Sequence, residues 1–179
     1  AALDASGLAA SYSTAGAANW ISAPGGEFGQ NATYAGLGNG KPAIMTTDSS
    51  GCGSGYVLLG AAALNAFDDS GNNSENADCN YTSGFNGTSA AAPMVSGVVA
   101  LMLETNPSLT WRDVKHLLAA TARQVDADRI GITLNDTVVE PGWTTNSAGY
   151  SFHNSYGFGA VDAQAAVSAA ATFVPNALG

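Results

Sequence analysis

The stretch that decides the fold is residues 85–104, which read FNGTSAAAPMVSGVVALMLE. After Ser89 the run is apolar nearly all round, and a helix of that kind is buried in the centre of a domain. Pro93 falls in or near the first turn of the predicted helix, where its missing N–H costs little, and Asn106-Pro107 stops the helix. The sequence therefore predicts a buried central helix that starts at Ser89.

Ser89 occupies a position that suits a nucleophile. The free N–H groups at the start of a helix, together with the positive end of its dipole, favour an oxyanion. Gly87 before the serine and the small alanines after it let a peptide backbone approach closely. We predict that Ser89 attacks a carbonyl while its own N–H holds the developing charge. An ordinary N-cap serine is the alternative that these features alone leave open.

Weaker patterns surround this helix. Ile44–Thr47 reads as a strand, and a second helix begins at Thr110, where Asp113 three residues on gives a capping-box pattern. Residues 127–150 read as an irregular hairpin, and an Ala-rich helix is predicted near 161–171. Two further stretches are read only coarsely: 1–25 as short extended segments, and 57–67 as either strand or short helix.

Composition excludes several classes of partner. The 179 residues, 46% of them hydrophobic and 11% charged, form one domain with no internal repeat or linker. A net charge of −9, from 14 acids against 5 bases, leaves too few cations to neutralise nucleic-acid phosphates. No apolar run approaches bilayer-spanning length, so we also expect no membrane partner.

Two cysteines, Cys52 and Cys79, lie in a stretch rich in Gly, Ser, Asn and Asp. A disulfide that closes this polar loop is the favoured interpretation in an extracellular setting, with two unpaired thiols as the alternative. Neither cysteine has a second Cys or a His at ligand spacing, which argues against a metal site.

The nucleophile stretch resembles a family motif. Residues 87–93 match the Gly-Thr-Ser-x-Ala-x-Pro pattern of subtilisin-like serine proteases at every specified position. Further segments resemble the kexin-like and furin-like branch, so that the resemblance spans nearly the whole chain: 12–25, 45–48, 104–114 and 156–163. It implies an α/β fold in which residues 1–179 are the C-terminal part of a peptidase S8-like, three-layer parallel-sheet domain. The implied activity is peptide-bond hydrolysis through an acyl-enzyme on Ser89.

No histidine precedes Ser89 in this sequence, although the family's catalytic triad requires one there. In the family the aspartate, the histidine and the oxyanion asparagine all precede the serine, whereas His116 and His153, the only histidines here, follow it. We interpret both as structural. The resemblance therefore implies a secreted peptidase, acting on proteins or peptides, whose N-terminal part is a separate or nicked chain that completes the site.

An oxygen-rich loop suggests calcium as a structural cofactor. The candidate ligands suit a hard cation, although their spacing is not that of an EF-hand: Asp68, Asp69, Asn72, Glu75 and Asp78. A solvated acidic loop is the alternative. Elsewhere, Thr14 replaces a glutamate that helps to bind calcium in convertases, which weakens that metal site and any expectation of dibasic specificity.

Two other functions stay open at this point. An α/β-hydrolase would use Ser89, then Asp126 or Asp136, then His153, but its elbow requires Gly-x-Ser-x-Gly and residue 91 is Ala. The second is an inert fragment or pseudoprotease that serves as a structural or binding module.

Overall fold

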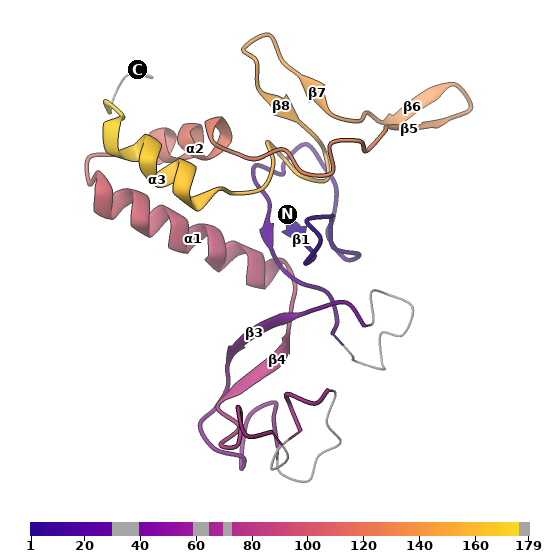
Figure 1. Cartoon of the computed structure of the whole chain (residues 1–179). Coiled ribbons are helices and arrows are strands. Elements are labelled where there is room, and N and C mark those ends of the chain that lie inside the picture. Colours follow the sequence, from indigo (N-terminus) through magenta and orange to yellow (C-terminus); the bar gives the residue numbers. More distant parts are fainter. Residues whose placement is uncertain (30–39, 59–64, 70–72, 176–179) are drawn as a thin grey trace.

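The computed structural model describes residues 1–29, 40–58, 65–69 and 73–175 (Figure 1). Its described helices are α1 (Thr88–Thr105), α2 (Trp111–Ala120) and α3 (Ala163–Thr172), as the sequence predicts to within two residues. The three pack together on one side of the molecule (Figure 1). The core between them is built from apolar side chains of all three helices, chiefly Val98, Met102, Val114, Leu117, Leu118, Ala166 and Ala170.

The predicted capping box of α2 is confirmed. The Asp113 N–H donates to Thr110 Oγ1 at 3.3 Å, and the Thr110 N–H donates to Asp113 Oδ2 at 2.8 Å. These bonds satisfy N–H groups that a helix start leaves without partners, and they set where α2 begins. Asp162 does the same for α3, since its side chain accepts from the Ala165 N–H at 2.9 Å.

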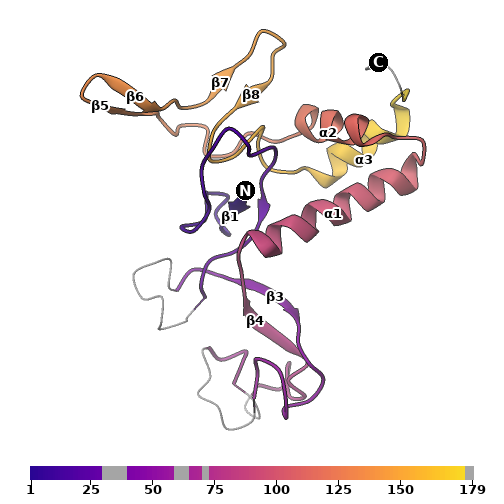
Figure 2. The same cartoon turned by 180° about the vertical axis from the view of Figure 1, so that it is seen from behind.

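The described strands form four pairs. Parallel pairing is confined among them to β1 (Ala2–Leu3) and β2 (Ala23–Pro24). The antiparallel pairs are β3 (Ile44–Thr47) with β4 (Tyr81–Phe85), β5 (Ile132–Leu134) with β6 (Thr137–Glu140), and β7 (Thr144–Thr145) with β8 (Ser151–Phe152). The hairpins β5–β6 and β7–β8 point away from the helices, and β3–β4 extends on another side of the body (Figure 1 and Figure 2).

The hairpin predicted over 127–150 owes its turn to two residues. Asn135 and Asp136 both have positive φ, 47° and 60°, as a two-residue hairpin turn of the left-handed type requires. The predicted strand Ile44–Thr47 is also confirmed. Of the stretch 57–67, residues 59–64 lie outside the described part, and the remaining residues belong to no helix or strand.

The disulfide predicted between Cys52 and Cys79 is present, with a Cα–Cα distance of 5.0 Å. It closes a loop across 27 positions of the sequence. Closing a loop of this length restricts the unfolded chain and stabilises the fold by about 3–4 kcal/mol.

One expectation needs correction: α1 is not buried all round in this chain. Ala90, Ala91, Val98 and Met102 are buried, but Met94, Leu101 and Leu103 are 38–48% exposed. The reason is that α3, together with β1 and β2 at the first turns, covers one face of α1, and the other faces are left uncovered by the described elements (Figure 2).

The expectation that no run is long enough for a bilayer is also wrong by length and composition. Among the described residues, the α1 helix alone is long and apolar enough to cross a membrane. The central helix of a water-soluble domain meets the same criterion when it is covered on all sides.

Candidate active site

Ser89 is the second residue of α1, and its side chain is exposed. The N-cap is Gly87, with φ 106°, a backbone conformation that glycine adopts at little cost. Ser89 is therefore not an ordinary N-cap serine. Within the described part of the chain its hydroxyl has no hydrogen-bond partner, and its N–H belongs to the first turn, where N–H groups lack intrahelical acceptors.

Hydrogen bonds of the Tyr12 hydroxyl hold the loop that leads into Ser89. Tyr12 Oη accepts from the Gly87 N–H at 2.9 Å and donates toward the carbonyls of Gly25 and Gly26, at 2.8 and 2.7 Å. The Gly87 N–H also donates to Gly25 O at 3.1 Å. Burial raises the pKa of Tyr12, so its hydroxyl keeps the proton that these bonds need. The start of α1 is thus tied to the Ala-Pro-Gly corner at residues 23–26.

The Asn86 side chain makes a second link, between this loop and Glu27. Its Nδ2 donates to the backbone oxygen of Glu27 at 3.0 Å. The Glu27 side chain is buried and accepts from the Ser11 N–H and the Ser11 hydroxyl, at 2.6 and 2.8 Å. Asn86 therefore positions the loop. Sequence reasoning did not single out Tyr12 or Glu27 as supports, because neither makes its contacts at a regular spacing along the chain.

A cavity of about 580 Å³ runs beside the first turns of α1. Its walls are Thr88, Ala91, Ala92 and Val95 from the helix, and residues of the 13–21 segment, among them Thr14, Asn19 and Trp20. No carboxylate lines it among the described residues. Thr88 belongs both to this wall and to the motif around Ser89, so the cavity adjoins Ser89.

Neither histidine takes part in this site. His153 is 1% exposed and lies against the rings of Trp143 and Tyr156, with Nδ1 accepting from the Ser155 N–H at 3.0 Å. His116 on α2 faces Tyr150 and Phe173. Both positions agree with a structural role.

The acids of the α/β-hydrolase alternative are engaged elsewhere. Asp126 accepts from the Tyr156 hydroxyl at 2.6 Å, and Asp136 lies in the exposed turn between β5 and β6. The order Ser89, acid, His153 is therefore not assembled as a relay in this chain.

The candidate calcium ligands are spread over differing environments. Asp68 is buried and accepts from the Ser83 N–H at 2.9 Å and from Asn65 Nδ2 at 2.9 Å. Glu75 and Asp78 are exposed, and Asn72 lies outside the described residues. No group of three or more His, Cys, Asp or Glu side chains is gathered for a metal within the described ranges. Calcium binding by this loop stays a prediction.

A glycine-capped helix that presents an unpartnered serine beside a cavity gives the serine the placement of a nucleophile, without a general base among the described residues. Comparison with known proteins identifies the family. The subtilase family model matches residues 1–159, and the chain belongs to that family. This membership removes the α/β-hydrolase alternative and confirms the fold class that the motif around Ser89 implied.

Relatives include bacterial and animal enzymes. The chain is 36% identical, over 97% of its length, to the Aeromonas extracellular serine protease of Aeromonas sobria, of which it covers 28%. It is 47% identical, over half of its length, to a PC3-like endoprotease of Hydra vulgaris, of which it covers 11%. The crystal structure of the A. sobria serine protease with a chaperone superposes with a TM-score of 0.83, at 36% identity over 97% of this chain and 29% of that one. The chain thus spans between a quarter and a third of the A. sobria protease.

Proposed function

We propose that this chain carries the nucleophile of a subtilisin-like serine endopeptidase that cleaves peptide bonds in proteins or peptides. The observation that carries the proposal is the presentation of Ser89: exposed, without a hydrogen-bond partner in the described chain, and mounted on Gly87. In the reaction, Ser89 Oγ attacks the scissile carbonyl carbon and gives its proton to a general base. The Ser89 N–H stabilises the oxyanion, the amine leaves with the proton, and water then releases the acyl group.

We further propose that this chain is the C-terminal part of the catalytic domain and that the N-terminal part of the same protease supplies the base. Two observations support this. The described histidines contact other residues than Ser89, and α1 carries apolar side chains, among them Met94 and Leu101, that are 40–48% exposed in the described chain. An apolar surface of this kind is favourable only when another surface removes it from water.

Secretion and calcium binding belong to the same proposal. The disulfide between Cys52 and Cys79 suits an oxidising compartment, and one relative is named an extracellular protease. The calcium proposal rests on the oxygen-rich loop at residues 68–78 alone. Stabilisation of the protein by millimolar calcium, lost on chelation, would support it.

The test is labelling of the full-length protein with a fluorophosphonate, followed by peptide mass mapping. We expect the label on Ser89, no label in Ser89→Ala, and unchanged labelling in Ser96→Ala, an exposed serine further along α1. If folded protein leaves Ser89 unlabelled while a known subtilase reacts, the chain belongs instead to a pseudoprotease that serves as a binding or structural module.

A further inference from the structure

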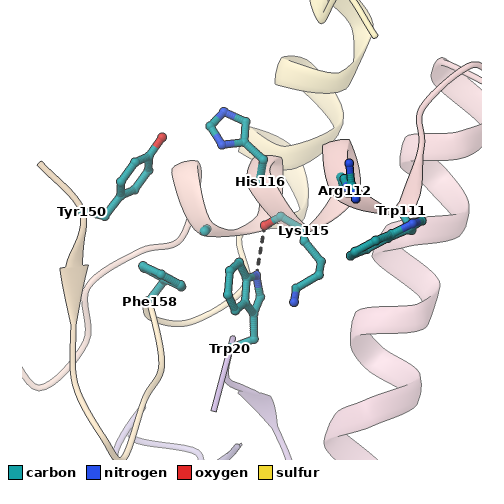
Figure 3. A pocket seen from close by; sticks show the side chains of 8 residues that line it. Trp20, Trp111, Arg112, Lys115, His116, Tyr150 and Phe158 are labelled. Carbon is teal, nitrogen blue, oxygen red and sulfur yellow. Dashed lines mark hydrogen bonds between the residues drawn. The ribbon is translucent and has the colours of Figure 1, made fainter. Parts of the chain in front are cut away.

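A second pocket, distinct from the cavity beside Ser89, lies between α2 and two aromatic loops (Figure 3). Its volume is about 350 Å³, within the range of sites that hold small ligands or single side chains. Its lining is mostly aromatic and basic: Trp20, Trp111, Arg112, Lys115, His116, Ala119, Tyr150 and Phe158.

The pocket is held in shape by contacts among its own walls. Trp20 Nε1 donates to Lys115 O at 3.0 Å, and the Phe158 N–H donates to Trp20 O at 3.0 Å. The Trp20 and Phe158 rings meet edge to face, with centroids 4.8 Å apart (Figure 3). Gly157 has φ 64°, and a Cβ there would lie 2.5 Å from the Trp20 backbone, so the two loops meet without a side chain between them. The aromatic wall formed by Trp20 and Phe158 is therefore held in place by contacts within the chain and needs no ligand to form.

The charge at this pocket is opposite to that of the whole chain. Two of the five Lys and Arg residues line it, although the chain carries a net charge of −9. Lys115 Nζ lies 4.0 Å from the centroid of the Trp20 ring, and no carboxylate lines the pocket among the described residues. Arg112 Cζ likewise lies 5.3 Å from the centroid of the Trp111 ring, so each cation lies over an aromatic wall. A ligand with an apolar ring and negative charge complements this combination of aromatic and basic side chains.

We propose that this pocket binds an acidic peptide segment, with one aromatic side chain packed against Trp20 and Trp111 and flanking carboxylates against Arg112 and Lys115. A peptide is the occupant that charge complementarity and pocket size favour, because the volume admits one large side chain and leaves the charges at its rim. The site is separate from Ser89, so it does not depend on the proposed peptidase activity. Trp20 also lines the cavity beside the first turns of α1, so this pocket and that cavity are neighbours.

The test is fluorescence anisotropy with labelled peptides and the full-length protein, carrying Ser89→Ala so that no peptide is cleaved. Three peptides are matched around the centre: Glu-Trp-Glu, Glu-Ala-Glu and Lys-Trp-Lys. We expect the first to bind at least tenfold more tightly than the other two, with an affinity that falls as salt rises. Arg112→Gln with Lys115→Gln should weaken it at least tenfold. Trp111→Ala should weaken it too, and this side chain is 68% exposed, so its loss leaves the fold intact.

The matched control is Arg123→Gln, which removes an exposed cation outside the pocket and should leave the dissociation constant unchanged. The proposal is overturned if Glu-Ala-Glu binds as well as Glu-Trp-Glu, if no peptide binds, or if the Arg112→Gln, Lys115→Gln double variant binds as the parent does. Because Ser89 labelling is measured separately, failure here leaves the peptidase proposal untouched.

Discussion

The position of Ser89 depends on how closely the backbone at residues 23–26 packs against Gly87, more than on contacts of the Ser89 side chain itself. Gly25 lies where any side chain would meet Ala2 Cβ at 2.6 Å, Gly87 O at 2.9 Å and Tyr12 Oη at 3.0 Å. The absence of a Cβ at this position lets the corner at residues 23–26 reach the N-cap of α1. The orientation of Ser89 is therefore decided partly by a glycine more than sixty positions earlier in the sequence.

Gly25→Ala should displace the N-cap of α1, because two of the three close atoms belong to the support of the Ser89 loop. We expect a loss of about 1–3 kcal/mol in the free energy of unfolding. The rate of fluorophosphonate labelling should fall more than tenfold, since a shift near 1 Å misplaces the hydroxyl. Urea unfolding and labelling kinetics of the full-length protein measure the two effects.

Gly53→Ala is the control for this prediction, since nothing lies within 4 Å of a Cβ built there. Its free energy of unfolding should change by less than about 0.5 kcal/mol, as at other open surface positions. Normal stability and labelling in Gly25→Ala would show that the corner does not position Ser89.

At the scale of elements, α1 has two separate structural roles. Its first turn presents Ser89, and its later turns supply Val98 and Met102 to the helical core. Met94 and Leu101, seven positions apart on one stripe, and Leu103 on another face of the helix are 38–48% exposed in this chain. Under the proposed completion by an N-terminal part, these side chains become buried.

Leu101→Asn distinguishes a covered α1 from an exposed one. If the rest of the protein covers this side, the substitution puts an amide into an apolar interface and lowers the free energy of unfolding by about 2–4 kcal/mol. Leu101→Met keeps the volume and apolar character and should cost less than about 1.5 kcal/mol. Urea unfolding of the full-length protein gives both values. A loss in Leu101→Asn below about 0.5 kcal/mol would contradict the proposed completion.

Over the whole molecule, long-range contacts gather around Tyr156. Its hydroxyl donates to Asp126 at 2.6 Å and accepts from the Ala9 N–H at 3.1 Å, and its ring stacks on Trp143. His153 lies against both rings, and its Nε2 is buried without a hydrogen-bond partner in the described chain, 3.8 Å from Glu140 Oε1. This cluster joins the N-terminal segment to the segment that follows the β5–β6 hairpin.

Burial lowers the pKa of His153 below its ordinary 6.5, and the repulsion of Arg129 adds to this, although Glu140 and Asp126 oppose it. The folded state therefore binds fewer protons at this site than the unfolded state. Stability should be complete above pH 6.5 and should fall as the pH drops from 6.5 toward the lowered pKa, by up to about 1.4 kcal/mol per pH unit.

His153→Gln should remove this contribution, because an amide does not titrate. Urea unfolding at pH 8, 7, 6 and 5 would follow the free energy of unfolding for both proteins. We expect the parent to lose more of its free energy of unfolding than the variant between pH 7 and 5. The values at pH 8 give the direct cost of the substitution. Parallel pH profiles would show that His153 does not couple folding to protons.

The sequence by itself determined the local elements and the family. The apolar run after Ser89 and the Thr110–Asp113 pattern predicted α1 and α2, and the motif at residues 87–93 indicated the family that the subtilase model confirms, because these signals are short-range along the chain. Which side of α1 is covered, how Tyr12 supports Gly87, and how Trp20 meets Lys115 were decided only in the tertiary structure. These contacts join residues 75 and 95 positions apart, and no periodicity connects residues that meet only after the chain has folded.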